Sequence, residues 1–192
     1  MEKELTQFLK FIQTFVPLKN SDVEVVTPHI KLLEFEKKEM ILGPTQKCQG
    51  IYFVLEGLFR VYNKKDGVEI NVLFVNEQDF FTDYESLMTN SLCKCNAETI
   101  EKTRLLFLPY DKLLQGYDNS HMLERLGRLM VERAFAVFIS RNNTTSSLKS
   151  ERKYLEFERA NPKLVNRIPL KHLASYFRIA PESLSRIRKS RV

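Results

Sequence analysis

The spacing of hydrophobic residues changes twice along the chain, and each stretch predicts a different kind of structure. Residues 2–15 repeat apolar positions every three or four residues and stop before Pro17, a pattern typical of an amphipathic helix. A second, short helix is expected around residues 23–26, where the run from Asn20 to Asp22 offers a cap. From His29 to Leu108 the segments become short, rich in β-branched and aromatic residues, and separated by glycines. The expected strands are Ile30–Glu36, Gln49–Leu55, Leu58–Tyr62 and Glu69–Val75.

Evenly spaced short strands with glycine turns favour an antiparallel β-roll or barrel. The strongest turn signal within them is Lys65-Asp66-Gly67, because a glycine after aspartate adopts a positive φ at little steric cost. We therefore expect a hairpin at this point of the roll.

The helical period returns between Ser120 and Ser140. One stripe recurs every three or four residues: Leu123, Leu126, Met130, Ala134 and Val137. This stripe can pack on the chain's own roll or on its twin in a second subunit. The opposite side also carries apolar residues, so two faces of the helix need covering: Leu129, Val131, Phe135 and Phe138. We expect a homodimer, with the first stripe at the interface.

The positive charge of the chain is concentrated in its last quarter. The whole sequence has 30 Lys and Arg against 24 Asp and Glu, whereas residues 141–192 alone have 13 basic and 4 acidic residues, a net charge of +9 that leaves −3 for the rest. This quarter is also rich in large apolar residues, which predicts a folded module and not a flexible arm. A compact module with one sign of charge favours polyanion binding, since Lys and Arg at phosphates release condensed counterions.

Residues 168–188 carry the most specific pattern in the chain. One helical face is formed by Leu170, Leu173, Ala174 and Phe177. A three-residue break, Arg178 to Ala180, separates it from a second helix that begins at Pro181 and has apolar residues at Leu184 and Ile187. This is the layout of a helix-turn-helix, although a plain helical hairpin with a solvated charged face gives the same spacing. The candidate DNA-binding residues are Lys171, Glu182, Ser183, Ser185, Arg186 and Lys189.

Two residues of the turn are not the ones favoured at their positions. A glycine would tolerate a positive φ better than Arg178, and Ala180 cannot cap a helix with its side chain as Ser or Thr would.

Composition excludes several other classes. With 43% hydrophobic residues and 14 Phe the chain can offset its ordering entropy, so disorder is excluded. No stretch reaches the roughly 20 apolar residues of a membrane span, and the N-terminus lacks the pattern of an export signal, so we expect a cytoplasmic protein without a membrane partner. The three cysteines, Cys48, Cys93 and Cys95, and the three scattered histidines show no ligand spacing. We expect no metal, no cofactor and no enzyme activity.

The order of helix, glycine-punctuated roll, long helix and helix-turn-helix resembles the Crp/Fnr family of bacterial transcription regulators. The resemblance rests on residues 50–62, on Asp66-Gly67 and on residues 168–188. It implies an α+β protein with an N-terminal antiparallel β-roll of the cyclic-nucleotide-binding-like kind (a double-stranded β-helix), a long dimerisation helix, and a helix-turn-helix that reads a palindromic site. The expected domains are 1–117, 118–141 and 142–192, the last without a full wing. Glu182 and Arg186 match the family's base-contacting Glu and Arg.

The sensor departs from the members that bind cyclic AMP, which resemble one another in a Gly-Glu pair and a later Arg-Ser/Thr pair. Here residues 80–84 have Thr82 in place of the glycine, and residues 91–97 contain no arginine. The bidentate contact to a cyclic phosphate is therefore missing, and we expect no response to cyclic AMP. Candidates for lining a pocket for another effector are Phe81, Thr82, Asp83, Tyr84 and Lys94; an apolar pocket and a simply filled core are both open.

The expected partners are double-stranded DNA, a second copy of the chain and a small-molecule effector of unknown identity, with RNA polymerase as a further candidate. The alternative is a β-roll that binds an effector or docks a protein and carries a basic tail without a DNA function.

Overall fold

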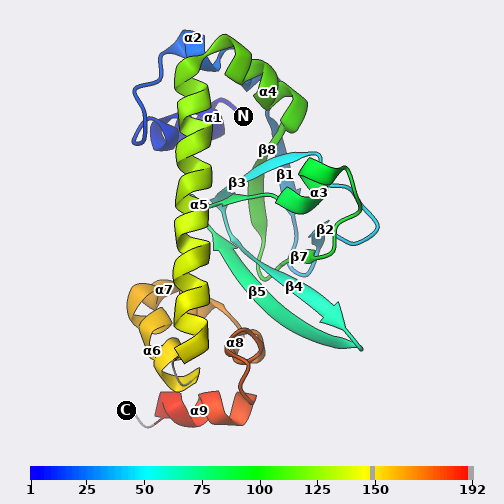
Figure 1. Cartoon of the computed structure of the whole chain (residues 1–192), viewed down its shortest axis with the longest axis vertical. Coiled ribbons are helices and arrows are strands. Elements are labelled where there is room, and N and C mark those ends of the chain that lie inside the picture. Colours follow the sequence, from blue (N-terminus) through cyan, green and yellow to red (C-terminus); the bar gives the residue numbers. More distant parts are fainter. Residues whose placement is uncertain (148–149, 190–192) are drawn as a thin grey trace.

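The computed structural model describes residues 1–147 and 150–189, with side chains described for 1–139 and 151–189. Two helices and a 3₁₀ helix come first (Figure 1): α1 (Glu2–Ile12), α2 (Asn20–Val23) and η1 (Thr27–His29). Short strands then follow, interrupted by one helix: β1 (Lys31–Phe35), β2 (Met40–Leu42), β3 (Gly50–Glu56), β4 (Leu58–Lys65), β5 (Val68–Asn76), β6 (Phe80–Phe81), α3 (Tyr84–Thr89), β7 (Asn96–Thr99) and β8 (Thr103–Pro109). The rest is helical: α4 (Tyr110–Asn119), α5 (His121–Ser147), α6 (Ser150–Ala160), α7 (Pro162–Arg167), α8 (Leu170–Phe177) and α9 (Pro181–Lys189).

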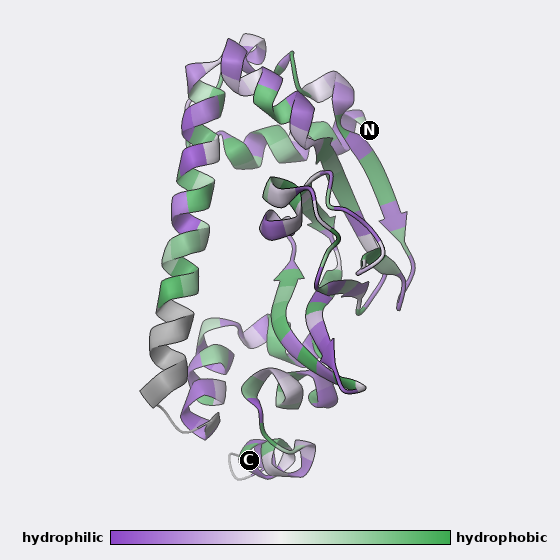
Figure 2. Cartoon of the chain, turned by 45° about the vertical axis from the view of Figure 1, so that its right-hand side comes forward, coloured by the Kyte–Doolittle hydropathy of each residue, from purple (hydrophilic) through white to green (hydrophobic). Residues whose placement is uncertain are grey.

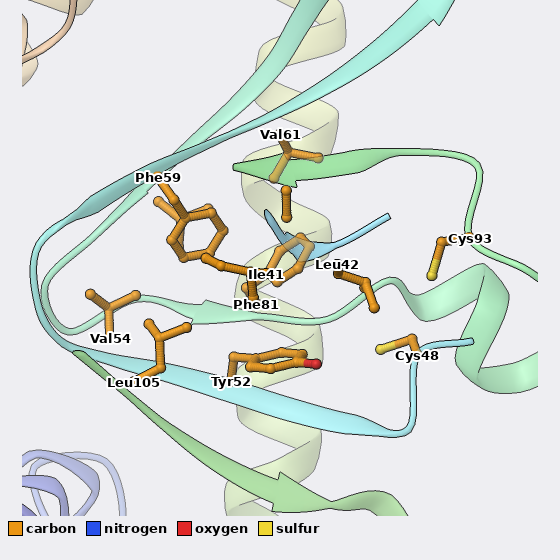
Figure 3. Packing of buried hydrophobic residues seen from close by; sticks show 12 residues of the cluster. Ile41, Leu42, Cys48, Tyr52, Val54, Phe59, Val61, Phe81, Cys93 and Leu105 are labelled. Carbon is orange, nitrogen blue, oxygen red and sulfur yellow. The ribbon is translucent and has the colours of Figure 1, made fainter. Parts of the chain in front are cut away.

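The strands form the antiparallel β-roll that the sequence predicts. One four-stranded sheet has the order β1-β8-β3-β6, and the other has the order β2-β7-β4-β5. Every pair of neighbouring strands in these two sheets is antiparallel. The two sheets enclose a core of aliphatic and aromatic side chains (Figure 3).

Strand β3 is buried on both faces, because its alternate side chains meet different partners. Tyr52 and Val54 point into the roll, while Phe53 and Leu55 face the N-terminal helix. The ring of Phe53 lies 5.1 Å from that of Phe8, which α1 supplies. This double burial explains why residues 50–55 read as an almost continuous apolar run and not as an alternation.

The predicted hairpin joins β4 to β5. Lys65 pairs with Val68, and the two residues between them have φ of 51° (Asp66) and 80° (Gly67). Both turn residues are thus left-handed, as in the primed turns that match the twist of paired strands. The hairpin is longer than expected, since β4 continues to Lys65.

The first helices differ from the prediction at their ends. The α-helical hydrogen bonds of α1 stop at Ile12, and the N–H groups of Thr14 and Phe15 bond instead three residues back, so the last turn tightens into a 3₁₀ form. The second helix starts earlier than expected, at Asn20 with Lys19 as its cap. The side chain of Asp22 accepts a hydrogen bond from the Lys19 N–H at 2.7 Å.

The long helix α5 extends to Ser147, beyond the predicted end near residue 140. The expected placement of Leu123 and Leu126 at a dimer interface is wrong for this structure, because the chain's own N-terminal helices bury both residues. Met130 is partly buried in the same cluster, whereas Ala134 and Val137 are exposed. Sequence periodicity could not reveal this, since the covering residues, such as Ile12 and Val16, lie more than a hundred positions away.

The C-terminal helices build the small core that their apolar content predicts. Its centre includes Leu173, Leu184 and Tyr154, none of which is exposed to solvent. The same cluster contains Leu58, Phe74 and Ile100 from the roll, so the module packs directly on the outside of the sensor sheet. The expectation of a missing wing concerns the chain after Lys189 and lies outside the described residues.

Candidate nucleic-acid interface

The predicted helix, three-residue turn and second helix are all present between Leu170 and Lys189. Arg178 ends α8 in the left-handed conformation, with φ of 56°. Its N–H donates to the carbonyl of Ser175 at 3.1 Å, and the N–H of Ile179 donates to that of Ala174 at 3.0 Å. These bonds satisfy the last carbonyls of α8 in the manner of a glycine cap, which offsets the strain of a non-glycine residue there.

One side of α9 is held against the module. Leu184 is fully buried, and Ile187 packs on the same core. The Arg188 Nε donates to the Tyr154 hydroxyl at 2.8 Å, and its Nη2 donates to the carbonyl of Val165 at 3.3 Å. Arg188 therefore fixes the end of α9 to the module and is not available to a ligand in this position.

The other side of α9 faces solvent. Glu182, Arg186 and Lys189 are exposed, and Ser183 and Ser185 are half-buried beside them. Glu182 and Arg186 are one turn apart on the same face. The Arg186 Nη2 lies 3.4 Å from the Ser183 hydroxyl. Figure 1 shows α9 at the end of the molecule opposite the N-terminal helices, with its outer side uncovered.

The preceding helix, α8, is docked on the roll. The Asn71 N–H of β5 donates to the Ser175 hydroxyl at 3.1 Å, and that hydroxyl donates to the carbonyl of Glu69 at 2.8 Å. Because β5 is an edge strand, a single serine thus satisfies both a free donor and a free acceptor of the sheet. The rings of Phe74 and Tyr176 add a contact at 5.3 Å between centroids.

A buried arginine strengthens this junction. The Arg60 side chain is 4% exposed and ion-pairs with Glu69 at 2.6 Å and with Glu98 at 3.0 Å. Its Nη1 also lies 3.2 Å from the Nδ1 of His172 in α8. Burial, followed by the Arg60 charge, lowers the pKa of His172 to about 4, so the ring is neutral and its Nδ1 can accept from the guanidinium.

A second set of ion pairs lies where the module meets the β5–β6 and β7–β8 connections of the roll. Arg167 of α7 pairs with Glu77 at 2.7 Å and also with Glu101. Burial raises the pKa of Glu77, but the hydrogen bonds from Arg167 and from backbone N–H groups outweigh it and hold the pKa at about 2. Sequence reasoning missed Arg60, Arg167 and Ser175, because nothing in their local pattern marks a contact across a hundred residues.

The five effector-pocket candidates lie in different environments. Phe81 is buried in the core of the roll, where its ring lies 5.2 Å from that of Phe59 (Figure 3). Thr82 donates to the carbonyl of Gly50 at 3.0 Å. Asp83 caps α3 by accepting from the Ser86 N–H at 3.2 Å. Two of the candidates lie on the surface, Tyr84 with 56% exposure and Lys94 in an ion pair with Glu85.

The thiols of Cys93 and Cys95, beside this region, are held in their protonated form. Burial, together with the Asp83 carboxylate, raises the pKa of Cys95 to about 12, and burial also raises the pKa of Cys93. The Cys95 Sγ donates to Asp83 at 3.4 Å. A thiol is nucleophilic only as a thiolate, so the environments of Cys93 and Cys95 disfavour thiol chemistry at neutral pH.

Residues 131–139 of α5 are not covered by the part of the chain that the structure describes. From Val131 to Ile139 every residue is exposed, including Phe135 at 63% and Phe138 at 57%. Figure 1 shows this half running past the roll toward the C-terminal module. An exposed apolar stripe of this kind marks an association surface.

The described residues also bear on metal binding and on membrane insertion, both of which the sequence disfavours. Among the residues described, no three His, Cys, Asp or Glu side chains are placed to hold a metal ion together. Within the same residues, no helix combines the length and the apolar character needed to cross a membrane.

Comparison with known proteins gives one family match, which covers the roll. Residues 32–120 match the family model described as the cyclic nucleotide-binding domain. No match is found among curated protein sequences.

Solved structures extend the likeness to almost the whole chain. A protein assigned to the Crp/Fnr transcriptional regulators, from Eubacterium rectale, is 14% identical with a TM-score of 0.70, and the match covers 94% of this chain and 87% of that one. FixK2 from Bradyrhizobium japonicum is 18% identical with a TM-score of 0.68, over 84% of this chain and 83% of its own. A cyclic nucleotide-binding domain containing protein from Listeria monocytogenes is 16% identical with a TM-score of 0.68, over 97% and 89%. The chain thus has the fold of Crp/Fnr regulators.

Proposed function

We propose that this protein is a transcription regulator of the Crp/Fnr type, which binds a palindromic DNA site as a homodimer. The observation that carries the proposal is that α8 is docked on the roll while α9 exposes one of its faces. The first helix is fixed to the roll through Ser175 and His172, while the second presents Glu182 and Arg186 to solvent. This is the arrangement in which a second helix enters the major groove.

The exposed side chains of α9 suit the edges of base pairs. An arginine can donate two hydrogen bonds to guanine O6 and N7, and a carboxylate can accept from cytosine N4. Arg186 and Glu182 lie one turn apart, so they can address neighbouring bases. The Ser183 hydroxyl beside Arg186 helps to orient the guanidinium. Lys189 and Lys171 add cations that suit phosphates.

The proposal of a palindromic site depends on dimerisation, which we place on the exposed face of the second half of α5. The chain leaves Val131, Phe135 and Phe138 exposed on this helix, and a twin helix would cover them. A two-fold axis along α5 then gives two copies of α9 related by the same symmetry, as an inverted repeat in DNA requires.

A role for cyclic AMP is disfavoured by the roll itself. Its interior is filled by side chains that include the rings of Tyr52, Phe81 and Phe107, with Tyr52 and Phe107 only 4.9 Å apart. The one cation among the pocket candidates, Lys94, is exposed and paired with Glu85. We propose that the regulator does not respond to cyclic AMP.

The test replaces Arg186 by alanine. Arg186→Ala is expected to cost about 1–3 kcal/mol of binding to a selected duplex and to relax the base preference at one position of each half-site. The measurement is a salt-titrated gel shift with duplexes that differ at single base pairs. Lys10→Ala, which removes one exposed cation from α1 at the other end of the molecule, is the control and should bind as the wild type does.

Unchanged affinity of Arg186→Ala for every duplex would contradict the assignment of α9. If the wild-type protein itself retained no sequence-selective fraction as salt rises, the protein would belong to the alternative class, a β-roll that docks a protein or an effector.

A further inference from the structure

The hairpin between β4 and β5 brings a second group of cations to the module that carries α9. We propose that Lys64 and Lys65 at the tip of this hairpin bind the DNA backbone, which makes the sensor roll itself part of the DNA-binding surface. This inference rests on the proposed function, and it extends the interface beyond the C-terminal module.

The position of the hairpin is the first support. A groove of about 510 Å³ separates it from the module. Val68, Glu69 and Ile70 of β5 line one side, and residues of α8, of the turn and of α9 line the other: Lys171, Ala174, Ser175, Arg178, Ile179 and Pro181. Since Pro181 is the first residue of α9, the groove reaches the N-terminal end of that helix. Figure 2 shows the hairpin next to the helices of the C-terminal module.

Strand register places the two lysines opposite residues that line this groove, with Lys64 and Lys65 on opposite faces of the hairpin. Lys64 pairs with Glu69 and Lys65 pairs with Val68, and both partners line the groove. Paired residues of neighbouring antiparallel strands lie about 4.5–5.5 Å apart at their Cα atoms, and they share one face of the sheet. Lys64 therefore shares the face of Glu69, whose carboxylate points toward Arg60 and α8.

The charges around the groove are unbalanced. Lys64, Lys65, Lys171 and Arg178 are all exposed, and none forms an ion pair with another described residue. Of the nearby acidic residues, Glu69 is already paired with Arg60, which leaves Asp66 of the hairpin and Glu182 of α9 against four cations. Four cations that the fold itself leaves unpaired suit a partner with repeated negative charges.

The expected path of DNA passes this point. In a helix-turn-helix the first helix crosses the sugar–phosphate backbone while the second enters the groove. The cation nearest to the start of α8 is Lys171, and it lies across the groove from Glu69. A backbone that contacts Lys171 is then within reach of the hairpin. Lysine suits this task because its ammonium binds phosphate as a point charge without reading bases.

The hairpin tip favours DNA over a protein partner. Protein interfaces depend on buried aromatic or aliphatic anchors. Between Asn63 and Glu69 the one large apolar side chain is Val68, and the rest are polar, charged or glycine. The tip is also well ordered for a preformed contact, because the strand pairing continues to Lys65 and Val68 and the turn has two residues.

The experiment compares Lys64→Gln/Lys65→Gln with wild type on one selected duplex, with long and with trimmed flanks. On the long duplex the dependence of log affinity on log salt should flatten by about 1 for each lysine that contacts a phosphate. The preference among bases should stay unchanged. On the duplex trimmed to the two half-sites, the difference between the two proteins should shrink.

Two further variants keep the result interpretable. Lys3→Gln/Lys10→Gln removes the same charge from α1 at the far end of the molecule and should leave the salt slope unchanged. Lys64→Arg/Lys65→Arg keeps the cations and should restore the wild-type slope.

If the wild type binds DNA selectively while Lys64→Gln/Lys65→Gln shows the wild-type slope and affinity on both duplexes, the hairpin does not contact DNA. Its lysines would then serve a protein surface, and the proposed function would stand. Loss of selective binding in the wild type would overturn the proposed function instead.

Discussion

At the scale of single residues, Arg60 joins three parts of the molecule. It lies on β4, pairs with Glu98 on β7 and Glu69 on β5, and reaches His172 on α8. Its guanidinium also lies 4.0 Å from the centre of the Tyr62 ring. A buried charge is tolerated only when it is paired and hydrogen-bonded, so these partners explain why an arginine can be 4% exposed here. The junction between roll and module depends on this residue.

The neutral state of His172 gives a prediction for pH. Its pKa in the folded protein, about 4, lies below the ordinary 6.5, so the unfolded chain binds the proton more readily. Below pH 6.5 protonation therefore favours unfolding, and the free energy of unfolding should fall as pH drops from 6.5 toward 4. Glu69 opposes this in part, whereas Arg60 and Lys171 act in the same direction as burial.

The measurement is urea unfolding at several pH values between 7 and 4. His172→Gln, which keeps an oxygen acceptor for Arg60, should remove most of the loss in this window. The matched control is His121→Gln, because the His121 side chain is fully exposed. Glu77 also affects stability, but at lower pH. Its pKa is about 2 in the folded protein and ordinarily 4.5, so its stabilising contribution is lost only below pH 4.5. Equal slopes for wild type and His172→Gln between pH 6.5 and 4.5 would show that His172 does not titrate as described.

At the scale of elements, the two halves of α5 have different environments. The first half is covered by the chain's own helices through Leu123 and Leu126, and Gly127 allows the Tyr117 ring to approach closely. A Cβ at position 127 would lie 2.1 Å from the Tyr117 hydroxyl, so a larger residue would have to displace the Tyr117 ring. Residues 131–139 of the second half are exposed, with no such cover from the described residues.

We predict that Phe135→Ser/Phe138→Ser converts the protein from a dimer to a monomer. Each phenylalanine buried on a partner contributes roughly 1.5–3 kcal/mol relative to an exposed one, so the double substitution should weaken association by several orders of magnitude. Sedimentation of both proteins over a range of concentrations measures this. Tyr84→Ser removes an exposed aromatic residue from α3 and should leave the dimer intact. A double variant that stays dimeric at the lowest concentration would place the interface elsewhere.

Elements set by local chemistry could be predicted from the sequence. The Asp66-Gly67 turn, the break at Arg178 to Ala180 and the start of α9 at Pro181 all lie where their residues predict them. Each depends on residues within four positions of one another: a positive φ, a helix cap or a missing N–H. The outward-facing positions of α9 could be predicted for the same reason, because Leu184 and Ile187 fix which side is buried.

Contacts between distant elements could not be predicted. The pattern of α5 correctly indicates two apolar faces, but it does not show that Val16 and Val26 cover one of them. Nor does any local signal mark Ser175 as the residue that caps the edge of β5. The sequence left open whether the region around Phe81 and Tyr84 lines an apolar pocket, yet Phe81 is buried in the core of the roll and Tyr84 is exposed. Which face of a short strand is inside is decided by the rest of the fold.

At the scale of the whole molecule, the positive charge of the sequence is concentrated in the part of the chain that forms the end with α9. Residues 141–192 carry +9 and the remaining residues carry −3, and the C-terminal module lies at one end of the long axis of the molecule (Figure 1). This charge distribution favours the approach of a polyanion to the end that exposes α9, because the rest of the chain has a net negative charge. The hairpin of β4 and β5 extends from the roll toward the same end.

The docking of α8 on β5 connects the roll to the position of α9. Strand β7 directly follows the Cys93–Cys95 segment and contains Glu98, which pairs with Arg60. A conformational change in that segment could therefore reach the junction between roll and module through this ion pair. In this account an effector would act by shifting the population of docked modules, which changes the spacing of the two α9 helices in the dimer. The neutral His172 and the Ser175 bridge define the docked state.

Selection of duplexes from a random pool by the purified wild-type protein tests the central claim most directly. The account predicts enrichment of an inverted repeat whose half-sites are centred about one helical turn apart, roughly 10–10.5 base pairs, because two α9 helices related by a two-fold axis must reach successive major grooves. The same selection with Arg186→Ala should give a repeat that is less defined at one position of each half. A pool that stays random, or a single half-site without a symmetric partner, would contradict the account.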